Sequence, residues 1–328
     1  MRKISTRGTM LAAAALVLGA TGPAWACGEA GNTSPIRLVV SQQAGGGTDT
    51  LARMWAETAR RELGTTVVVE NKAGAGGVIA AKYVLGQPAD GCTLFLAGVS
   101  QMVLNKFAYA PLAYKPEVDF APVAVLTTTP FVLVANPQSG IRTLQDLEAM
   151  AKAKPDAINF ASSGKGNSTH VIVELFQKNQ KLRMTHVPYK GEPDAIVGTV
   201  SGQTQVMAPT VATATPQIQA GKLVPLVLFS PKRVPELPNV PTASELGLTG
   251  FDDLGWMGIA AKAGTPPETI RRLHAASQKF LTDSAVLQKM KTMQVIPMPG
   301  PSNLLMQLTE RDTARLQSAM SDVDFKAN

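Results

Sequence analysis

Apolar and polar positions alternate along the chain in a regular order of strand-like and helix-like segments. Residues 36–40 are apolar and mostly β-branched, and apolar residues recur at helical spacing over 48–63. A second strand pattern covers 65–70, a helix pattern covers 78–85, and a third strand pattern covers 93–98. This order predicts a parallel sheet with right-handed crossover connections.

The alternation resumes after 121–137, where two strand-like runs are separated near Pro130. The next predicted elements are helices at 143–153, 167–179, 192–200 and 212–220, and strands at 157–162, 184–189, 204–209 and 223–230. A proline-rich segment then leads to a strand at 256–261 and to helices that begin at Pro266, at Ser284 and near residue 301. Two α/β units and a late return of the chain predict a two-lobed α/β fold. We expect lobe 1 to comprise 35–136 plus 252–300, and lobe 2 to comprise 137–251 plus 301–328.

The N-terminus has the pattern of a secretory signal peptide. Arg2, Lys3 and Arg7 precede a short apolar run, and Ala24-Trp25-Ala26 provides an A-x-A cleavage site. The apolar run is too short to span a bilayer. We therefore expect 1–26 to be removed after Ala26, and the product to be exported, which in an organism with two membranes means the periplasm.

Two cysteines leave several interpretations open. Cys27 would begin the mature chain, where it could carry a lipid anchor, although Ala24 and Trp25 do not match a lipobox. A disulfide with Cys92 is the second interpretation, because an exported protein meets an oxidising compartment. There is no C-x-x-C spacing typical of redox or zinc sites.

The charge pattern argues against nucleic-acid binding. The formal net charge is +7, and removal of the three basic residues of the signal peptide leaves 28 basic against 24 acidic residues, or +4. The basic residues are scattered and aromatic residues make up only 5%, whereas nucleic-acid binding favours a basic stripe with stacking rings. A mildly positive field instead suits an anionic small molecule.

The most informative local motif is the loop 41–49, SQQAGGGTD. Gly45, Gly46 and Gly47 lie between a predicted strand and the start of a predicted helix. Such a turn leaves backbone N–H groups unpaired where the helix dipole favours an anion, and glycines let a ligand approach the backbone. We expect Thr48 or Asp49 to cap the helix.

A second strand–loop–helix junction covers 162–170, SSGKGNSTH. Its small and polar residues can cap the helix or donate hydrogen bonds to a carboxylate: Ser162, Ser163, Gly164, Asn167, Ser168, Thr169 and His170. One such loop in each lobe would direct two helix N-termini at a single anion between them. Further candidates at strand ends are Ser100, Tyr189, Pro209 and Thr210.

Sequence motifs of catalysis, metal binding and nucleotide binding are missing. The chain has no G-x-S-x-G elbow, no H-E-x-x-H, no Walker motif and no complete G-x-G-x-x-G. We therefore expect a binding protein that is not an enzyme and that needs no cofactor or metal. One alternative stays open, an exported serine hydrolase that would use Ser162, Ser163 or Ser168 near His170.

Nine sequence blocks fall in order over about 35–322 and resemble the Bug-type substrate-binding proteins of tripartite tricarboxylate transporters. They include IRLVVSQQAGGGTDTLAR, VVVENKAGAGGVIAA, INFASSGKGNSTH, HVPYKG and VPTASELGL. The resemblance implies a type II periplasmic binding protein fold, a Venus-flytrap clamp. It also implies a small carboxylate ligand, such as a dicarboxylate, a tricarboxylate or an aromatic carboxylate, and delivery to inner-membrane transporter subunits. We expect a monomer. A sensor that signals to a membrane kinase is an alternative that the sequence leaves open.

The resemblance also implies which residues bind the ligand. In this family backbone amides and ordered water hold the carboxylate, and the Tyr189 region closes over it. Two departures stand out: Gln42-Gln43 replaces an apolar lip that contains proline, and Pro209-Thr210 replaces a pair that often contains aspartate. Without that acid we expect no amino-acid ligand. The complete predicted set is Ser41, Gln42, Gln43, Gly45, Gly46, Gly47, Thr48, Asp49, Ser100, Ser162, Ser163, Gly164, Asn167, Ser168, Thr169, His170, Tyr189, Pro209 and Thr210.

Overall fold

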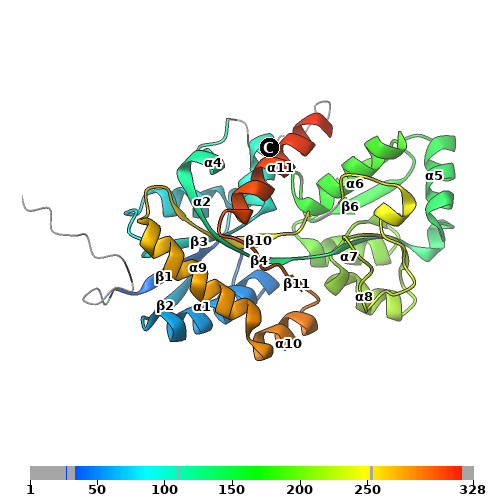
Figure 1. Ribbon diagram of the computed structural model, residues 1–328. Helices are drawn as coiled ribbons and strands as arrows, with labels where there is room; N and C mark the ends of the chain where they lie inside the picture. The colour runs from blue at the N-terminus through cyan, green and yellow to red at the C-terminus, as the bar shows by residue number, and fades with distance from the viewer. Residues whose placement is uncertain (1–26, 28–33, 110, 252–253, 320–328) are drawn as a thin grey trace, which may run out of the picture.

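Two lobes, each built on its own sheet, lie side by side (Figure 1). The computed structural model describes residues 27, 34–109, 111–251 and 254–319. The predicted signal peptide therefore lies outside the described residues. The first sheet has the strand order β11-β4-β10-β3-β1-β2, and the second has the order β7-β6-β8-β5-β9. In the first sheet β1 pairs in parallel with β2 and β3, and in the second sheet β6 pairs in parallel with β7 and β8, as the alternating pattern predicts.

The elements follow the predicted order closely. The strands are β1 Ile36–Val40, β2 Val67–Asn71, β3 Thr93–Gly98, β4 Phe120–Thr128, β5 Phe131–Ala135, β6 Asn159–Ser162, β7 Thr185–Pro188, β8 Val206–Met207, β9 Val224–Phe229, β10 Met257–Lys262 and β11 Ile296–Pro297. The helices are α1 Gly47–Leu63, α2 Val78–Leu85, α3 Asn105–Ala108, α4 Pro116–Asp119, α5 Leu144–Ala153, α6 Ser168–Gln180, α7 Glu192–Val200, α8 Val211–Gln219, α9 Pro267–Thr282, α10 Ser284–Thr292 and α11 Leu304–Ala319. A short helical segment, η2, covers Ser100–Leu104.

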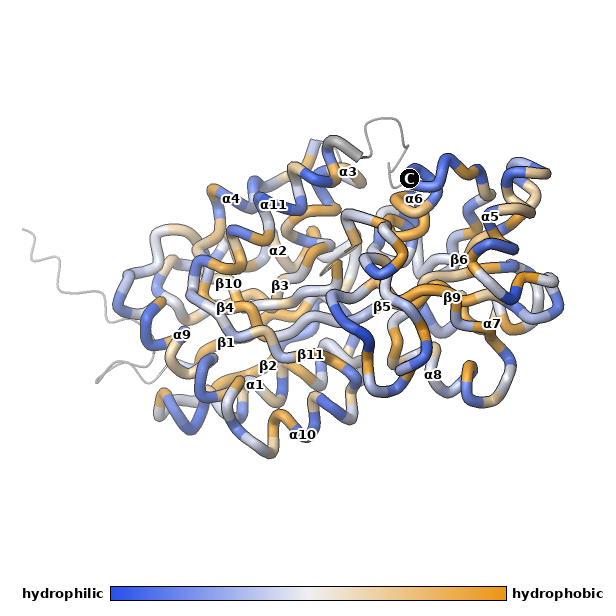
Figure 2. Tube along the Cα trace, turned by 45° about the vertical axis from the view of Figure 1, so that its right-hand side comes forward, coloured by the Kyte–Doolittle hydropathy of each residue, from blue (hydrophilic) through white to orange (hydrophobic). Residues whose placement is uncertain are grey.

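The strands of the first sheet are apolar on both faces because helices cover both. Leu38 and Val40 of β1 pack with Trp55 of α1 and Phe280 of α9, whereas Val39 packs into the cluster on the opposite face. The indole Nε1 of Trp55 donates to Ser277 Oγ at 3.0 Å inside this core, so its polar group is satisfied. Figure 2 shows the hydrophobic residues gathered along the strands and the hydrophilic ones along the outer turns.

The chain passes between the lobes through two adjacent segments. β4 leads into β5 through Thr129 and Pro130, and the chain returns to β10 through Gly255 and Trp256. Thr129 N donates to Gly255 O at 3.1 Å, and a Cβ on Gly255 would lie only 2.2 Å from Thr129 O. The two connections therefore run backbone against backbone, and only glycine fits at this position.

The lobe boundaries predicted from the sequence are wrong in two places. β5 belongs to the second sheet, so that lobe begins near Pro130 rather than at 137. α11 packs against β4 and η2 of the first lobe, although 301–328 was assigned to the second. The fully buried Asp312 of α11 explains this packing, because it accepts a 2.8 Å hydrogen bond from Trp256 Nε1.

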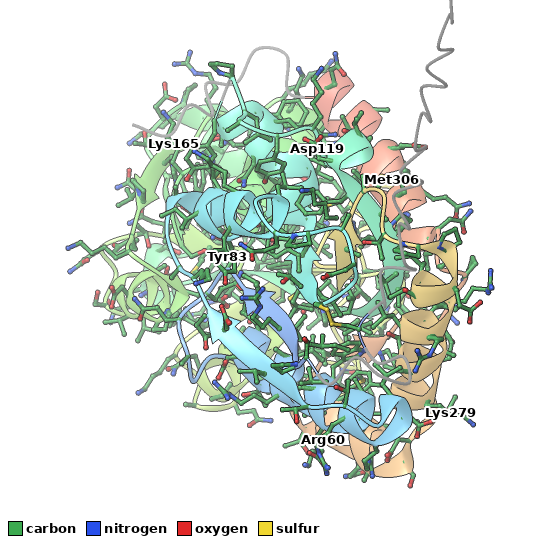
Figure 3. All side chains as sticks on the ribbon, turned by 90° about the vertical axis from the view of Figure 1, so that its left-hand side faces the viewer. Arg60, Tyr83, Asp119, Lys165, Lys279 and Met306 are labelled. Carbon is green, nitrogen blue, oxygen red and sulfur yellow. A yellow bond between two sulfur atoms is a disulfide. The ribbon has the colours of Figure 1, made fainter. Side chains whose placement is uncertain are left out.

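A disulfide joins Cys27 to Cys92, immediately before β3 (yellow bond in Figure 3). Both cysteines are buried in the core of the first lobe. The sequence left open a lipid anchor on Cys27 or a disulfide with Cys92, and the structure contains the disulfide. Because a thioether-linked lipid would use the same sulfur atom, the disulfide form carries no lipid on Cys27.

Candidate functional site

The cleft between the lobes contains three adjoining cavities. The central cavity, of about 180 Å³, is lined by Gln42 and Thr48 of the first lobe, Ser168 and Thr210 of the second, and the Trp256 connection. Residues from both lobes thus surround a single space, which is the arrangement that a clamp requires.

Each of the two flanking cavities shares lining residues with the central one. The first, of about 200 Å³, is named here the Lys165 cavity, and it shares Gln42, Ser100 and Gln101 with the central cavity. The second, of about 420 Å³, is named the Glu192 cavity, and it shares Thr48, Thr129, Thr210 and Met257 with the central cavity. The three adjoining cavities are together called the groove below.

Only some of the predicted ligand residues line this groove. The lining residues are Ser41, Gln42, Gly47, Thr48, Ser100, Asn167, Ser168 and Thr210. The remaining predicted residues line none of the three cavities: Gln43, Gly45, Gly46, Asp49, Ser162, Ser163, Gly164, Thr169, His170, Tyr189 and Pro209.

The 41–49 loop presents an open helix N-terminus. Gly46 is the N-cap residue of α1, and among the described residues no side chain caps this helix. The prediction that Thr48 or Asp49 would cap α1 is therefore wrong. The N–H groups of the first turn have no acceptor within the helix. Gly47 and Thr48 line the groove, so this end of the helix is available to an anion there.

Asp49 holds the shape of this loop from behind. Its buried carboxylate accepts from Gly45 N at 3.0 Å, from Asn71 Nδ2 at 3.0 Å and from the Arg53 guanidinium at 2.9 and 3.0 Å. The hydrogen bonds from Arg53, together with those from Gly45 and Asn71, hold the pKa of Asp49 at about 2. Asn71 also donates to Gln42 O at 3.1 Å, which fixes the start of the loop.

The 162–170 loop satisfies most of its polar groups internally. Asn167 caps α6 by accepting from Thr169 N at 3.0 Å, as predicted for this helix start. Thr169 Oγ1 in turn accepts from Ser163 N at 2.9 Å, and Ser162 Oγ accepts from Gly164 N at 3.1 Å. The loop therefore presents the side chains of Asn167 and Ser168 to the cleft more than it presents free backbone groups.

Two stacked histidines support the second loop from inside the lobe. The rings of His170 and His186 have centroids 3.8 Å apart, and Phe160 stacks on His186 at 4.9 Å. Gly166 N donates to His170 Nδ1 at 3.1 Å, so the proton of neutral His170 is on Nε2, which lies 3.4 Å from Glu174 Oε1. His170, which was predicted to touch the ligand, is only 2% exposed.

Ser162 and His186 form a hydrogen-bonded pair with a 2.6 Å distance between Oγ and Nε2. Burial is the main cause that lowers the pKa of His186 to about 3. His186 is therefore neutral near pH 7 and suited to accept the Ser162 proton. Ser162 itself is completely buried, which separates this serine from the cleft and from any ester substrate there.

Thr210 at the start of α8 is bound to an acid that the sequence did not reveal. Glu192 Oε1 accepts from both Thr210 N and Thr210 Oγ1 at 2.8 Å. The lack of an acid at Pro209-Thr210 was the reason to expect no amino-acid ligand. That reason does not hold, because folding brings the Glu192 carboxylate to Thr210.

Tyr189 and Pro209 serve the second lobe rather than the groove. The Tyr189 ring packs on Gly198 of α7, where a Cβ would lie within 2.8 Å of three ring and hydroxyl atoms, and its hydroxyl donates to Gln203 Oε1 at 3.2 Å. Pro209 is buried, and its carbonyl accepts from Val132 N at 3.0 Å.

Several groove residues carried no recognisable sequence signal. Thr129, Gly255 and Trp256 come from the two inter-lobe connections, whose pairing is a long-range feature of the fold, and Met257 is the first residue of β10. Gln101 is 3% exposed, and it bridges Gly98 N at 3.0 Å and Gly76 O at 3.1 Å. The glycine-rich run NKAGAGG before α2, which was part of a family block but not of the predicted ligand set, contributes lining residues to the Lys165 cavity.

Metal chemistry has no site in the described part of the chain, where no group of three or more histidine, cysteine, aspartate or glutamate side chains could hold an ion. None of the described helices has the length and apolar character needed to cross a bilayer. Polar side chains from both lobes line the groove, which suits it to holding a small polar molecule.

The family model of the tripartite tricarboxylate transporter family receptor matches residues 51–324. The chain belongs to this receptor family. The receptor is similar to BugT of Bordetella pertussis, with 34% identity over 264 residues that cover 80% of this chain and 81% of that protein.

Solved structures share the fold of this receptor. It is similar to R. palustris Rpa4515, solved with adipate, with a TM-score of 0.78 and 29% identity over 88% of this chain and 96% of that one. It is also similar to MatC from Rhodopseudomonas palustris, solved with bound malate, with a TM-score of 0.75 and 31% identity over 87% and 98% of the two chains. These matches confirm the resemblance found in the sequence and the two-lobed binding-protein fold.

Proposed function

We propose that this protein is a periplasmic receptor that captures a small carboxylate between its lobes and delivers it to the membrane subunits of a tripartite tricarboxylate transporter. Membership of the receptor family supports the role, and the similar proteins solved with adipate and malate support the ligand class. The pattern of the first 26 residues supports export with cleavage after Ala26. A monomer without catalytic activity is part of the proposal.

The observation that carries the proposal is the uncapped N-terminus of α1 at the groove. Its first-turn N–H groups lack intrahelical acceptors, and a carboxylate supplies the acceptor and the negative charge that this position favours. Ser168 and Asn167 of the second lobe line the same groove. A ligand bound to both lobes would stabilise the closed clamp, because only the closed form makes both sets of contacts.

The proposed contact residues are the predicted ones that line the groove, from Ser41 and Gln42 to Ser168 and Thr210. Gln42 stands at the junction of the central and Lys165 cavities. It replaces the apolar lip of similar proteins, so we propose that its amide contributes to this receptor's own ligand preference. Asp49, Thr169 and His170 act from behind by holding the two loops.

The test is isothermal titration of refolded, ligand-free protein against monocarboxylates, dicarboxylates, tricarboxylates, aromatic carboxylates and amino acids. We expect at least one class to bind, and Gly46→Val to weaken that binding about 100-fold or more. A side chain at Gly46 meets only Gln43 O, at 3.9 Å, so the fold has room for it while the approach to the helix end is blocked. Gly86→Ala, outside the groove, is the control. Absence of binding by every class, or unchanged affinity in Gly46→Val, would contradict the proposal.

A further inference from the structure

The Glu192 cavity has a composition unlike the rest of the groove. Its apolar wall comes from Leu51, Met257, Met293 and Val295, and its polar wall from threonines and Glu192. Glu192 is the first residue of α7, and Oε1 accepts both hydrogen bonds from Thr210. Glu192 lines the cavity, and within the described residues no hydrogen bond or ion pair involves Oε2.

The groove has opposite charges at its two ends. Of the described lining residues, Lys165 is the only basic one and Glu192 the only acidic one. Their cavities share no lining residue with each other, and each joins the central cavity, which the described chain lines without any charged side chain. The Glu192 carboxylate is thus the only acidic group among the described lining residues, and the middle of the groove is lined by uncharged side chains.

We propose that the Glu192 cavity is a subsite for a positively charged group, and that the ligand is a carboxylate whose far end carries an ammonium. The inference rests on the proposed function, because it assumes that the carboxylate binds at the α1 and Lys165 side. A second carboxylate at the Glu192 end would face a like charge in a partly apolar space, which is unfavourable. An ammonium there finds the free Oε2 and the hydroxyls of Thr50 and Thr213.

The walls of the cavity fit the same ligand. The thioethers of Met257 and Met293 are polarisable and adapt to an alkyl chain or to methyl groups on nitrogen. The bonds from Glu192 to Thr210 also tie α7 to α8, which is a structural role. That role needs an acceptor but no negative charge, so an isosteric amide separates it from recognition of a cation.

The experiment is isothermal titration at pH 7 with pairs of equal carbon number: 4-aminobutyrate with succinate, 5-aminopentanoate with glutarate, and 6-aminohexanoate with adipate. The variants are Glu192→Gln and, as a matched control, Asp194→Asn, which removes an exposed charge from the same first turn of α7. We expect the wild type to favour the best ammonium ligand over its dicarboxylate partner by about tenfold or more. Glu192→Gln should lose this preference, whereas Asp194→Asn should keep it.

Two results would overturn the subsite. One is a wild type that binds dicarboxylates as well as, or better than, their ammonium partners. The other is an ammonium preference that survives in Glu192→Gln. Failure of the wild type to bind any carboxylate, including those of the broader panel above, would instead contradict the proposed function, so the two failures are distinguishable. Thermal unfolding of Glu192→Gln shows whether α7 and α8 remain joined.

Discussion

The loops 41–49 and 162–170 occupy corresponding places, each between a strand and a helix at the groove, yet they satisfy their polar groups in opposite ways. In the first loop the helix end is uncapped, and the fixing contacts come from Asp49 behind it. In the second, Asn167 caps the helix and the hydroxyls bond to one another within the loop. The glycines of the first loop leave the N-terminus of α1 uncapped, whereas Asn167 caps the N-terminus of α6 in the second loop.

This difference indicates a division of labour between the lobes. An open helix end leaves unsatisfied N–H donors that a ligand can pair with, so we expect the first lobe to supply the anion contact. Most polar groups of the loop 162–170 are already hydrogen-bonded to one another. We therefore expect the second lobe to present a fixed surface that carries Ser168 and Lys165.

Loss of the disulfide should destabilise the first lobe most. Cys27 and Cys92 are 65 residues apart in sequence, and the loop-entropy model gives about 4 kcal/mol for a loop of this length. We expect Cys92→Ser to lower the free energy of unfolding by about 2–4 kcal/mol, measured by urea denaturation. The double variant Cys27→Ser/Cys92→Ser should be no less stable than Cys92→Ser alone, because either change removes the disulfide. A urea midpoint of Cys92→Ser equal to that of the wild type would show that the disulfide does not stabilise the protein.

Acid should weaken the second lobe before the first. The pKa of His186 is lowered to about 3 in the folded protein, so the unfolded chain binds the proton more readily below its ordinary value near 6.5. Stability from this group is complete above about pH 6.5, and it falls by up to about 1.4 kcal/mol per pH unit as the pH drops toward 3.

The matched variant for this acid effect is His186→Gln, which keeps a hydrogen-bond acceptor for Ser162 but does not titrate. We expect its unfolding free energy to depend less steeply on pH between 6.5 and 4 than that of the wild type. If the unfolding free energies of the two proteins changed with pH in the same way, groups other than His186 would be responsible for the acid sensitivity.

Removal of the Asp49 carboxylate should damage both stability and binding. Asp49→Ala leaves Gly45 N–H and the Asn71 amide without their acceptor, at a cost of about 2 kcal/mol, and releases the loop. Because the pKa of Asp49 is held at about 2, its contribution is present above about pH 4 and is lost as the pH falls toward 2. Urea unfolding and ligand titration measure the two losses. If Asp49→Ala bound carboxylates as tightly as the wild type, the loop 41–49 would not need the Asp49 carboxylate to hold its shape.

Exchange of the caps should produce the smallest effects, of opposite kinds in the two loops. Gly46→Ser should change stability by only a few tenths of a kcal/mol but weaken carboxylate binding about tenfold, because the hydroxyl competes for the open N–H groups. Asn167→Ala should cost about 1 kcal/mol of stability. The two loops would not differ as described if Gly46→Ser bound ligand as tightly as the wild type.

Much of the fold could be predicted because local signals mark it. The predicted helix at 78–85 has the observed bounds, since Gly77 and Gly86 flank an apolar run. The pairing of β5 was less accessible, because five apolar residues next to β4 fit either sheet. The position of α11 depends on Asp312 meeting Trp256, a contact across 56 residues that no local pattern encodes.

The candidate groove was predictable to a similar extent. The glycines and the small polar residues of the two loops gave its location, because their composition reports backbone exposure directly. Glu192 gave no signal, since an acid at the first turn of a helix is common and its bond to Thr210 depends on how α7 and α8 pack. Tyr189 was assigned to the ligand from resemblance, whereas its ring packs on Gly198 of α7.

The close contact of Thr129 with Gly255 has a consequence for modularity. It makes the second lobe a continuous insertion, about 130–251, whose entry and exit are separated by one hydrogen bond. Removing that insertion would leave two chain ends that a short linker could join without disturbing β4 or β10. The same junction would accept the corresponding lobe of a related receptor, so chimaeras joined at Thr129 and Gly255 offer a direct way to reassign ligand choice one lobe at a time.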